Sequence, residues 1–161
     1  LAKLRKYYKE TVIICSSTMS RGVSLLMQLS KQVAKILDSE NYDAEILEMH
    51  HNQKVDSPSG TATSLGKPIA EGRECEFSEK YCAIRDGVIG KRPKGQIGFS
   101  TIRGGDVIGD HHVIFAGDGE RIEISHKASN RKIYANGAIR ACIWAKESNK
   151  KNGFFSMKDI L

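Results

Sequence analysis

The segments GQIGFSTIR (residues 95–103), DVIGDHHVIFAG (106–117) and ERIEISHKA (120–128) decide the fold. Each has β-branched residues and the length that are typical of strands, and the first two also contain a phenylalanine. The connections between them, GGD at 104–106 and GDGE at 117–120, contain the glycines that tight turns favour. The three segments therefore predict consecutive hairpins and an antiparallel meander.

A short strand and a long helix are expected before the meander. TVIIC (residues 11–15) is an unbroken, mostly β-branched apolar run, which predicts a short buried strand. Apolar residues recur at helical spacing over residues 23–37, and Ser20 is a candidate N-cap for that helix. A strand followed directly by a helix is typical of the βα units of parallel sheets.

A second strand and two further helices complete the expected elements. AEILEMH (residues 44–50) alternates as a half-buried strand does. Ser59 offers a cap for a helix that begins near residue 61 and ends at residue 68 or 72, and residues 129–147 return to helical spacing. The predicted fold class is α+β, with a mostly antiparallel or mixed sheet and flanking helices.

Composition and charge limit the possible partners. The 161 residues are 40% hydrophobic and 27% charged, which suits one compact domain. The net charge of +6 favours anionic partners, but the positive residues are scattered and form no basic stripe interleaved with aromatics. No apolar run approaches the length of a signal peptide core or a membrane span. We expect a cytoplasmic protein that binds neither nucleic acid nor membranes.

Cysteines and histidines do not form a recognisable metal site. The four cysteines, which we expect to be free thiols in a reducing compartment, form no C-x-x-C pair: Cys15, Cys75, Cys82 and Cys142. The adjacent pairs His50/His51 and His111/His112 lack the i, i+4 spacing of helical zinc ligands. We expect no metal; a polar contact on the surface or in the core is the simpler role for such a pair.

The stretch EMHHNQKVDSPSGTA (residues 48–62) has the composition of an anion site. A helix that begins near Thr61 leaves its first N–H groups available, and Gly60 lets a ligand approach that backbone closely. Ser59 and Thr61 add hydroxyl donors, and Lys54 adds a positive charge. With a histidine that titrates near neutral pH, this set could bind a small carboxylate and move a proton. A plain capped helix after a proline loop is the alternative.

The same stretch resembles the signature of the dihydrodipicolinate reductase family, also described as 4-hydroxy-tetrahydrodipicolinate reductase, in the spacing E-x-H-H-x-x-K-x-D-x-P-S-G-T-A. The resemblance extends through the three strand segments and through YANGAIRA (residues 134–141), so it covers nearly the whole chain. It implies reduction of 4-hydroxy-tetrahydrodipicolinate with NADPH or NADH in diaminopimelate and lysine biosynthesis, a small dicarboxylate substrate and a homotetramer.

The resemblance also implies site residues. His50 would be the catalytic acid/base, and Lys54 a second proton donor that contacts a carboxylate. Substrate-binding roles fall on five further residues: His51, Ser59, Gly60, Thr61 and Arg131. A cofactor-binding role falls on a segment that would touch the nicotinamide end: Ser16, Ser17, Thr18 and Met19. Thr18 stands where the family commonly has asparagine, so one cofactor hydrogen bond is expected to differ.

The expected domains follow from the same resemblance. Residues 1–20 would be the βα remnant of a Rossmann-like dinucleotide-binding domain, 21–146 the substrate-binding and oligomerisation domain, and 147–161 a tail that docks on the nucleotide domain. No glycine-rich turn of the G-x-G-x-x-G type precedes Ser16. We therefore expect a piece of a longer enzyme that is inactive alone.

Two alternatives stay open from the sequence. The chain could be a truncated, catalytically inactive module that binds a dicarboxylate or assembles with copies of itself. It could also be an unrelated phosphate- or nucleic-acid-binding domain that uses its net positive charge, in which case binding should weaken steeply with salt.

Overall fold

The computed structural model describes residues 2–149 and 152–161. These residues form two compact units: a central unit of residues 26–129, and a terminal unit built from the chain up to residue 25 and from residue 130 onward. Helix α2 (Arg21–Ile36) begins in the terminal unit and continues into the central unit. The other elements of the central unit are β2 (Asp43–His50), α3 (Gly60–Gly72), α4 (Phe77–Lys80), β3 (Tyr81–Cys82), β4 (Ile97–Arg103), β5 (Gly109–Gly117) and β6 (Glu120–Ala128).

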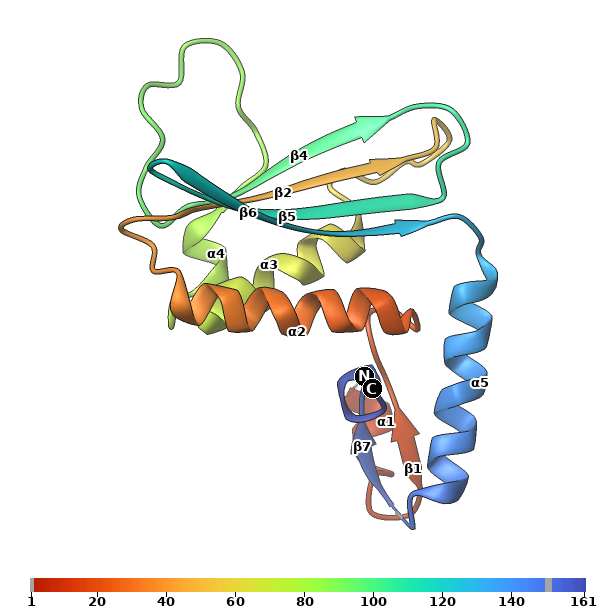
Figure 1. Ribbon diagram of the computed structural model, residues 1–161. Coiled ribbons are helices and arrows are strands. Elements are labelled where there is room, and N and C mark those ends of the chain that lie inside the picture. Colours follow the sequence, from red (N-terminus) through yellow and green to blue (C-terminus); the bar gives the residue numbers. More distant parts are fainter. Residues whose placement is uncertain (1, 150–151) are drawn as a thin grey trace. The chain divides into compact units, whose positions relative to one another are not determined.

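The five strands of the central unit form one mixed sheet in the order β3-β4-β2-β5-β6. Figure 1 labels the last four of these strands. β5 and β6 pair as the predicted hairpin, but the predicted hairpin of β4 and β5 is wrong, because β2 lies between them. β2 is antiparallel to β5 and parallel to β4. A parallel neighbour requires a crossover connection, which residues 51–96 supply with α3 and α4. The α+β class with a mixed sheet is confirmed, whereas the continuous meander is not.

The GGD segment passes round the end of β2 instead of closing a hairpin. Gly104 donates its backbone N–H to the carbonyl of His50 at 3.0 Å, and His51 donates its N–H to the carbonyl of Val107 at 2.7 Å. The loop between β4 and β5 therefore fixes the backbone at the point where β2 ends.

One face of the sheet carries the core and packs against α2 and α3 (Figure 1). Side chains alternate along β2, and the buried ones are Ala44, Ile46, Glu48 and His50. The hydrophobic part of this core is Leu26, Ala34, Ala44, Ile46, Ala62, Leu65, Ile69, Ala70, Ile97, Phe99, Val113 and Phe115. The polar side chains of Glu48 and His50 thus lie on the same face of β2 as Ala44 and Ile46.

Both predicted caps of α2 and α3 are present. Ser20 Oγ accepts the N–H of Val23 at 3.2 Å, and Ser59 Oγ accepts the N–H of Ala62 at 3.1 Å. α3 runs through Pro68 and ends at Gly72, the later of its two predicted ends.

The terminal unit contains α1 (Ala2–Arg5), β1 (Val12–Ile14), α5 (Lys132–Glu147), β7 (Gly153–Phe155) and the short 3-10 helix η1 (Met157–Asp159). The predicted strand in TVIIC is β1; it pairs in parallel with β7 and is half-buried. α5 packs closely on the segment after β1, because a Cβ at Gly137 would lie 1.7 Å from the carbonyl oxygen of Met19.

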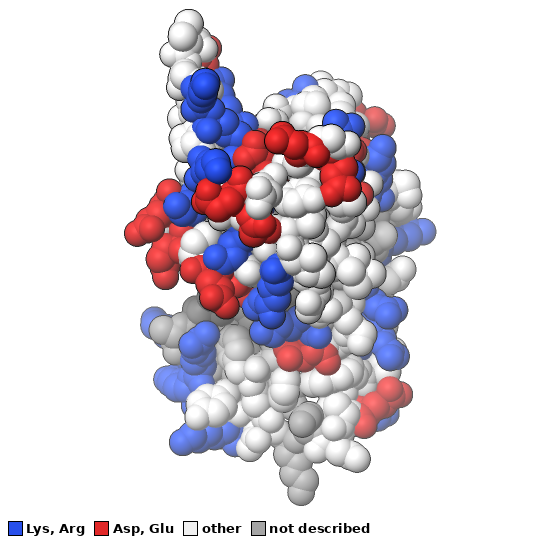
Figure 2. All heavy atoms as spheres, turned by 60° about the vertical axis from the view of Figure 1, so that its left-hand side comes forward, with Lys and Arg blue, Asp and Glu red and all other residues white. Residues whose placement is uncertain are grey.

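Surface charge agrees with the scattered pattern of the sequence. Figure 2 shows Lys and Arg interspersed with Asp and Glu over the visible face rather than gathered in a patch of one sign. Over residues 2–149 and 152–161, no helix has both the length and the apolar character that crossing a membrane requires.

Candidate functional site

The candidate site lies at the carboxyl end of β2. His50 ends this strand and is in register with Arg103, the last residue of the parallel strand β4. Ser59, early in the crossover connection, contacts the end of β2: its backbone N–H donates to Glu48 Oε1 at 2.9 Å. β5 adds His111, whose ring centroid lies 5.1 Å from that of His50 in an edge-to-face arrangement. Four segments distant in sequence therefore meet at one end of the sheet.

Glu48 is a buried anion at the centre of this site, with a fully buried side chain (0% exposed). Arg103 donates to both carboxylate oxygens at 2.8 Å each, His50 Nδ1 lies 2.5 Å from Oε2, and the Thr101 hydroxyl donates to Oε1 at 3.3 Å. Burial opposes ionisation of this carboxyl, but the hydrogen bonds from Arg103 and His50 outweigh burial and lower its pKa to about 2. Glu48 is therefore ionised at neutral pH.

His50 is buried between this carboxylate and β5. Burial lowers the pKa of His50 below its ordinary value and outweighs the Glu48 carboxylate, which raises it. A Cβ at Gly109 would lie 2.9 Å from His50 Nε2, which is closer than side chains pack. Glycine at position 109 therefore lets the ring nitrogen that does not face Glu48 lie close to the backbone of β5.

Lys54 and the start of α3 form the cationic side of the site. Lys54 Nζ pairs with Asp56 Oδ1 at 2.7 Å, and its side chain is 21% exposed. The hydrogen bond from Lys54, with one from the Gly60 backbone, lowers the pKa of Asp56. A Cβ at Gly60 would meet no atom within 4 Å, so the helix start is open beside partly buried Thr61. The Asp56 carboxylate contacts both the Lys54 ammonium group and the Gly60 N–H, so a ligand carboxylate would bind these donors in its place.

Ser59 and His111 form a buried support beneath the helix start. Ser59 is 1% exposed, and its Oγ lies 3.3 Å from His111 Nε2 while it accepts the Ala62 N–H. Burial lowers the pKa of His111 to about 4, so its ring is neutral at physiological pH. Ser59 therefore holds the end of α3, and its direct contact with a substrate stays a prediction.

Three residues of the site were not predicted from the sequence: Glu48, Arg103 and His111. A signal for Glu48 was available, because residues two apart on a strand share a face and Ile46 belongs to the core. The register then places His111 opposite Glu48. Arg103 has no comparable local signal, since its role depends on the parallel pairing of β4 with β2.

The other predicted site residues are distributed over both units. His51 follows β2 directly and is partly buried. Arg131 precedes α5, and Ser16, Ser17, Thr18 and Met19 follow β1, all of them in the terminal unit. Thr18 is buried and its Oγ1 accepts the Ser20 N–H at 3.1 Å. These five residues belong to the terminal unit, whereas His50 belongs to the central unit.

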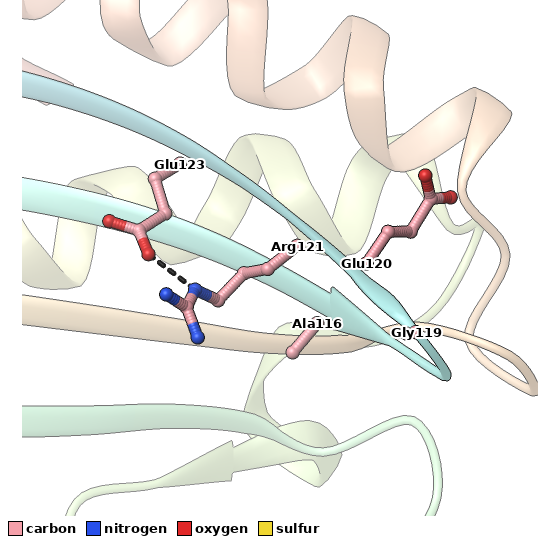
Figure 3. A pocket seen from close by; sticks show the side chains of 6 residues that line it. Ala116, Gly119, Glu120, Arg121 and Glu123 are labelled. Atoms are coloured by element: carbon pink, nitrogen blue, oxygen red, sulfur yellow. Dashed lines mark hydrogen bonds and ion pairs between the residues drawn. The ribbon is translucent and has the colours of Figure 1, made fainter.

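A hollow lies at the opposite end of β5 from His111, around the turn to β6 (Figure 3). Its charged lining consists of Glu120, Glu123 and Arg121, and the Arg121 guanidinium pairs with Glu123. Two carboxylates against one paired cation do not suit an acidic ligand, so this hollow does not compete with the site at His50. Within the described part of the chain, no group of three or more His, Cys, Asp or Glu side chains is arranged to hold a metal ion.

The fold and the site together define an α+β domain suited to hold a small acid beside a histidine that can exchange a proton. Residues 22–161 match the family model described as dihydrodipicolinate reductase, C-terminus. The chain is 52% identical over 159 residues to a 4-hydroxy-tetrahydrodipicolinate reductase of Agrobacterium fabrum, covering 99% of this chain and 57% of that protein. It is 50% identical over 159 residues to the reductase of the same name from Bartonella quintana, covering 99% and 58%.

A solved structure agrees with the fold. The dipicolinate-bound dihydrodipicolinate reductase from Paenisporosarcina sp. TG-14 superposes with a TM-score of 0.69 at 23% identity, over 93% of this chain and 54% of that one. The chain therefore belongs to the dihydrodipicolinate reductase family, and it spans a little over half the length of the relatives it matches.

Proposed function

We propose that this chain supplies the substrate-binding and proton-donating part of a 4-hydroxy-tetrahydrodipicolinate reductase, which acts in diaminopimelate and lysine biosynthesis with NADPH or NADH. The observation that carries the proposal is the meeting of the Glu48–His50 pair with Lys54 and the open start of α3. A dicarboxylate substrate needs cationic and N–H donors, and a reduced carbon needs a nearby proton. The site holds groups of both kinds.

Each group has a task in this proposal. Lys54 and the backbone at Gly60 and Thr61 bind a substrate carboxylate, with His51 and Arg131 as further contacts. His50 exchanges a proton through Nε2, and Lys54 is a second proton donor. The nicotinamide cofactor supplies the hydride when it is bound.

The segment Ser16–Met19 is proposed as the contact of this chain with the nicotinamide end of the cofactor. It follows the carboxyl end of β1, the edge at which nucleotides bind to parallel sheets. The Thr18 hydroxyl is already bonded to the Ser20 N–H, so cofactor contacts fall on the less buried residues of the segment. The described residues contain no glycine-rich turn for the pyrophosphate, so that cradle must come from outside them.

Lys54→Ala is expected to weaken binding of dipicolinate to this chain by roughly 10- to 100-fold, because a hydrogen bond to a charged group is lost. Isothermal titration calorimetry with pyridine-2,6-dicarboxylate measures the change. Lys67→Ala is the matched control, since it removes the same charge from an exposed position on α3. Equal affinity in both variants, or no binding by the unsubstituted chain, would contradict the proposed site. An inactive dicarboxylate-binding module would also pass this test, and only turnover in a complete reductase separates the two.

We also propose that copies of this chain assemble as a homotetramer through the sheet face opposite the helices. Apolar side chains lie exposed on and beside that face, including Ile102 on β4 and Ile84, Val88 and Ile89 in the segment between β3 and β4. Val88 and Ile84 are the most exposed of them, at 105% and 86%. A cluster of this kind commonly marks an interface between proteins.

Val88→Lys is therefore expected to lower the sedimentation coefficient from that of a tetramer toward that of a smaller species, while the subunit stays folded. Ile36→Lys, which replaces another exposed apolar residue at the end of α2, is the control and should leave assembly unchanged. A monomer at high concentration in the unsubstituted protein would refute the assembly. Analytical ultracentrifugation distinguishes these results.

A further inference from the structure

We infer that Glu48 is the positioning residue for His50: its carboxylate keeps the proton of the imidazole on Nδ1 and so leaves Nε2 as the nitrogen that meets the ligand. The role given to His50 rests on the proposed function. The position of its proton does not, and it follows from the contacts of Glu48 alone.

Every neighbour that hydrogen-bonds to the Glu48 carboxylate is a donor. Oε1 accepts from the Ser59 backbone N–H, from the Thr101 hydroxyl and from one Arg103 nitrogen, at 2.9, 3.3 and 2.8 Å. Oε2 accepts from the other Arg103 nitrogen at 2.8 Å and faces His50 Nδ1. Arginine stays protonated in proteins, so its two N–H groups donate to Glu48 and favour the ionised carboxylate.

An acceptor-only carboxylate fixes the state of the ring that it faces. The proton between Oε2 and Nδ1 belongs to His50, because an ionised carboxylate has none to give. Neutral His50 therefore carries its lone pair on Nε2, and protonated His50 donates from Nε2. Gly109 lets this same nitrogen lie close to the backbone of β5, since a Cβ there would lie 2.9 Å from it. A carboxylate that orients a catalytic histidine in this way is known from serine hydrolases.

The geometry makes this coupling specific to His50. Glu48 and His50 are two residues apart on β2 and share its buried face, so the strand itself sets their spacing. Arg103 and Ser59 hold the carboxylate from the other sides, and it cannot swing away without breaking both of its bonds to Arg103. The ring of His111 packs edge-to-face against that of His50.

Nitrogen-15 NMR of the histidine rings in this chain tests the inference. Near pH 7.5 we expect His50 to be the Nδ1–H tautomer. In Glu48→Gln the side-chain amide can donate to Nδ1, so a substantial fraction of Nε2–H tautomer should appear. Thr101→Val is the matched control: it removes a different hydrogen bond to the same carboxylate and should leave the tautomer of His50 unchanged.

Turnover provides the second readout in a reductase that contains this chain. Glu48→Gln should lower kcat by roughly 10- to 100-fold with little change in KM, and shift the titration of His50 to lower pH. A purely structural role would lower stability without changing the tautomer. An Nε2–H tautomer in the unsubstituted chain, or an unchanged Nδ1–H tautomer in Glu48→Gln, would overturn the inference. Normal turnover in His50→Gln would instead contradict the proposed catalytic role of His50, while the inference about the position of its proton would still stand.

Discussion

His50→Gln in a reductase that contains this chain is expected to lower kcat by about 10²- to 10⁴-fold, the range that general acid–base catalysis contributes. Glutamine retains a hydrogen-bonding group of similar reach but has no proton that it can transfer near neutral pH. The substitution changes only the buried side chain at position 50 and its contact with Glu48. The backbone pairing of β2 should therefore be preserved. Circular dichroism and the melting temperature check the fold.

The assay requires a nucleotide-binding half, which a hybrid can supply. This chain would replace the 159 matching residues of the Agrobacterium fabrum reductase, to which it is 52% identical. His126→Gln is the matched control, because His126 lies on β6, one strand farther from His50 than His111. We expect kcat near the unsubstituted value for His126→Gln. Equal kcat in the two variants would remove His50 from the mechanism.

The motif could be predicted from the sequence because its signals are local. The alternation of residues 44–50, the proline at 58 and the Ser-Gly-Thr run each concern neighbouring residues, and the structure confirms the strand, the loop and the cap at Ser59. The grouping of His50, Lys54 and the helix start at one end of β2 follows from these elements. Their roles in binding and catalysis stay predictions.

The position of β2 within the sheet could not be predicted in the same way. GGD between two strand-like segments has the local signature of a hairpin, but β2 occupies the place between β4 and β5. The pairing of β2 with β4 joins residues more than fifty positions apart, and no pattern within either segment encodes it. The contact of Arg103 with Glu48 depends on this pairing, which is why the sequence did not reveal it.

Arg103→Met is expected to lower the free energy of unfolding by about 3–5 kcal/mol, the cost of breaking a buried ion pair from one side. Methionine preserves most of the length of the arginine stem but leaves Glu48 buried without its two strongest donors. The matched control is Arg121→Met, in which the lost pair with Glu123 is exposed and should change stability by less than about 1 kcal/mol. Urea denaturation of both variants measures the difference.

The pH dependence of the free energy of unfolding tests whether ionised Glu48 causes the loss of stability in Arg103→Met. The pKa of Glu48 is lowered from an ordinary value of 4.5 to about 2, which corresponds to about 3 kcal/mol. Since the folded pKa is below the unfolded one, this contribution is fully present above about pH 4.5 and is lost as the pH falls toward 2. Without Arg103 the pKa of Glu48 should rise. The stabilities of the variant and the unsubstituted protein should therefore converge in acid, and a difference that is constant with pH would point to packing instead.

Removing both partners separates the stability of the pair from its function. In Glu48→Leu/Arg103→Met no buried charge is left unpaired, and apolar replacement of a buried pair is often neutral or stabilising. We expect the double variant to recover most of the stability that Arg103→Met loses. Turnover should not recover, because His50 then has no acceptor at Nδ1 to fix its tautomer. Recovery of both stability and kcat would show that the buried pair serves the fold alone.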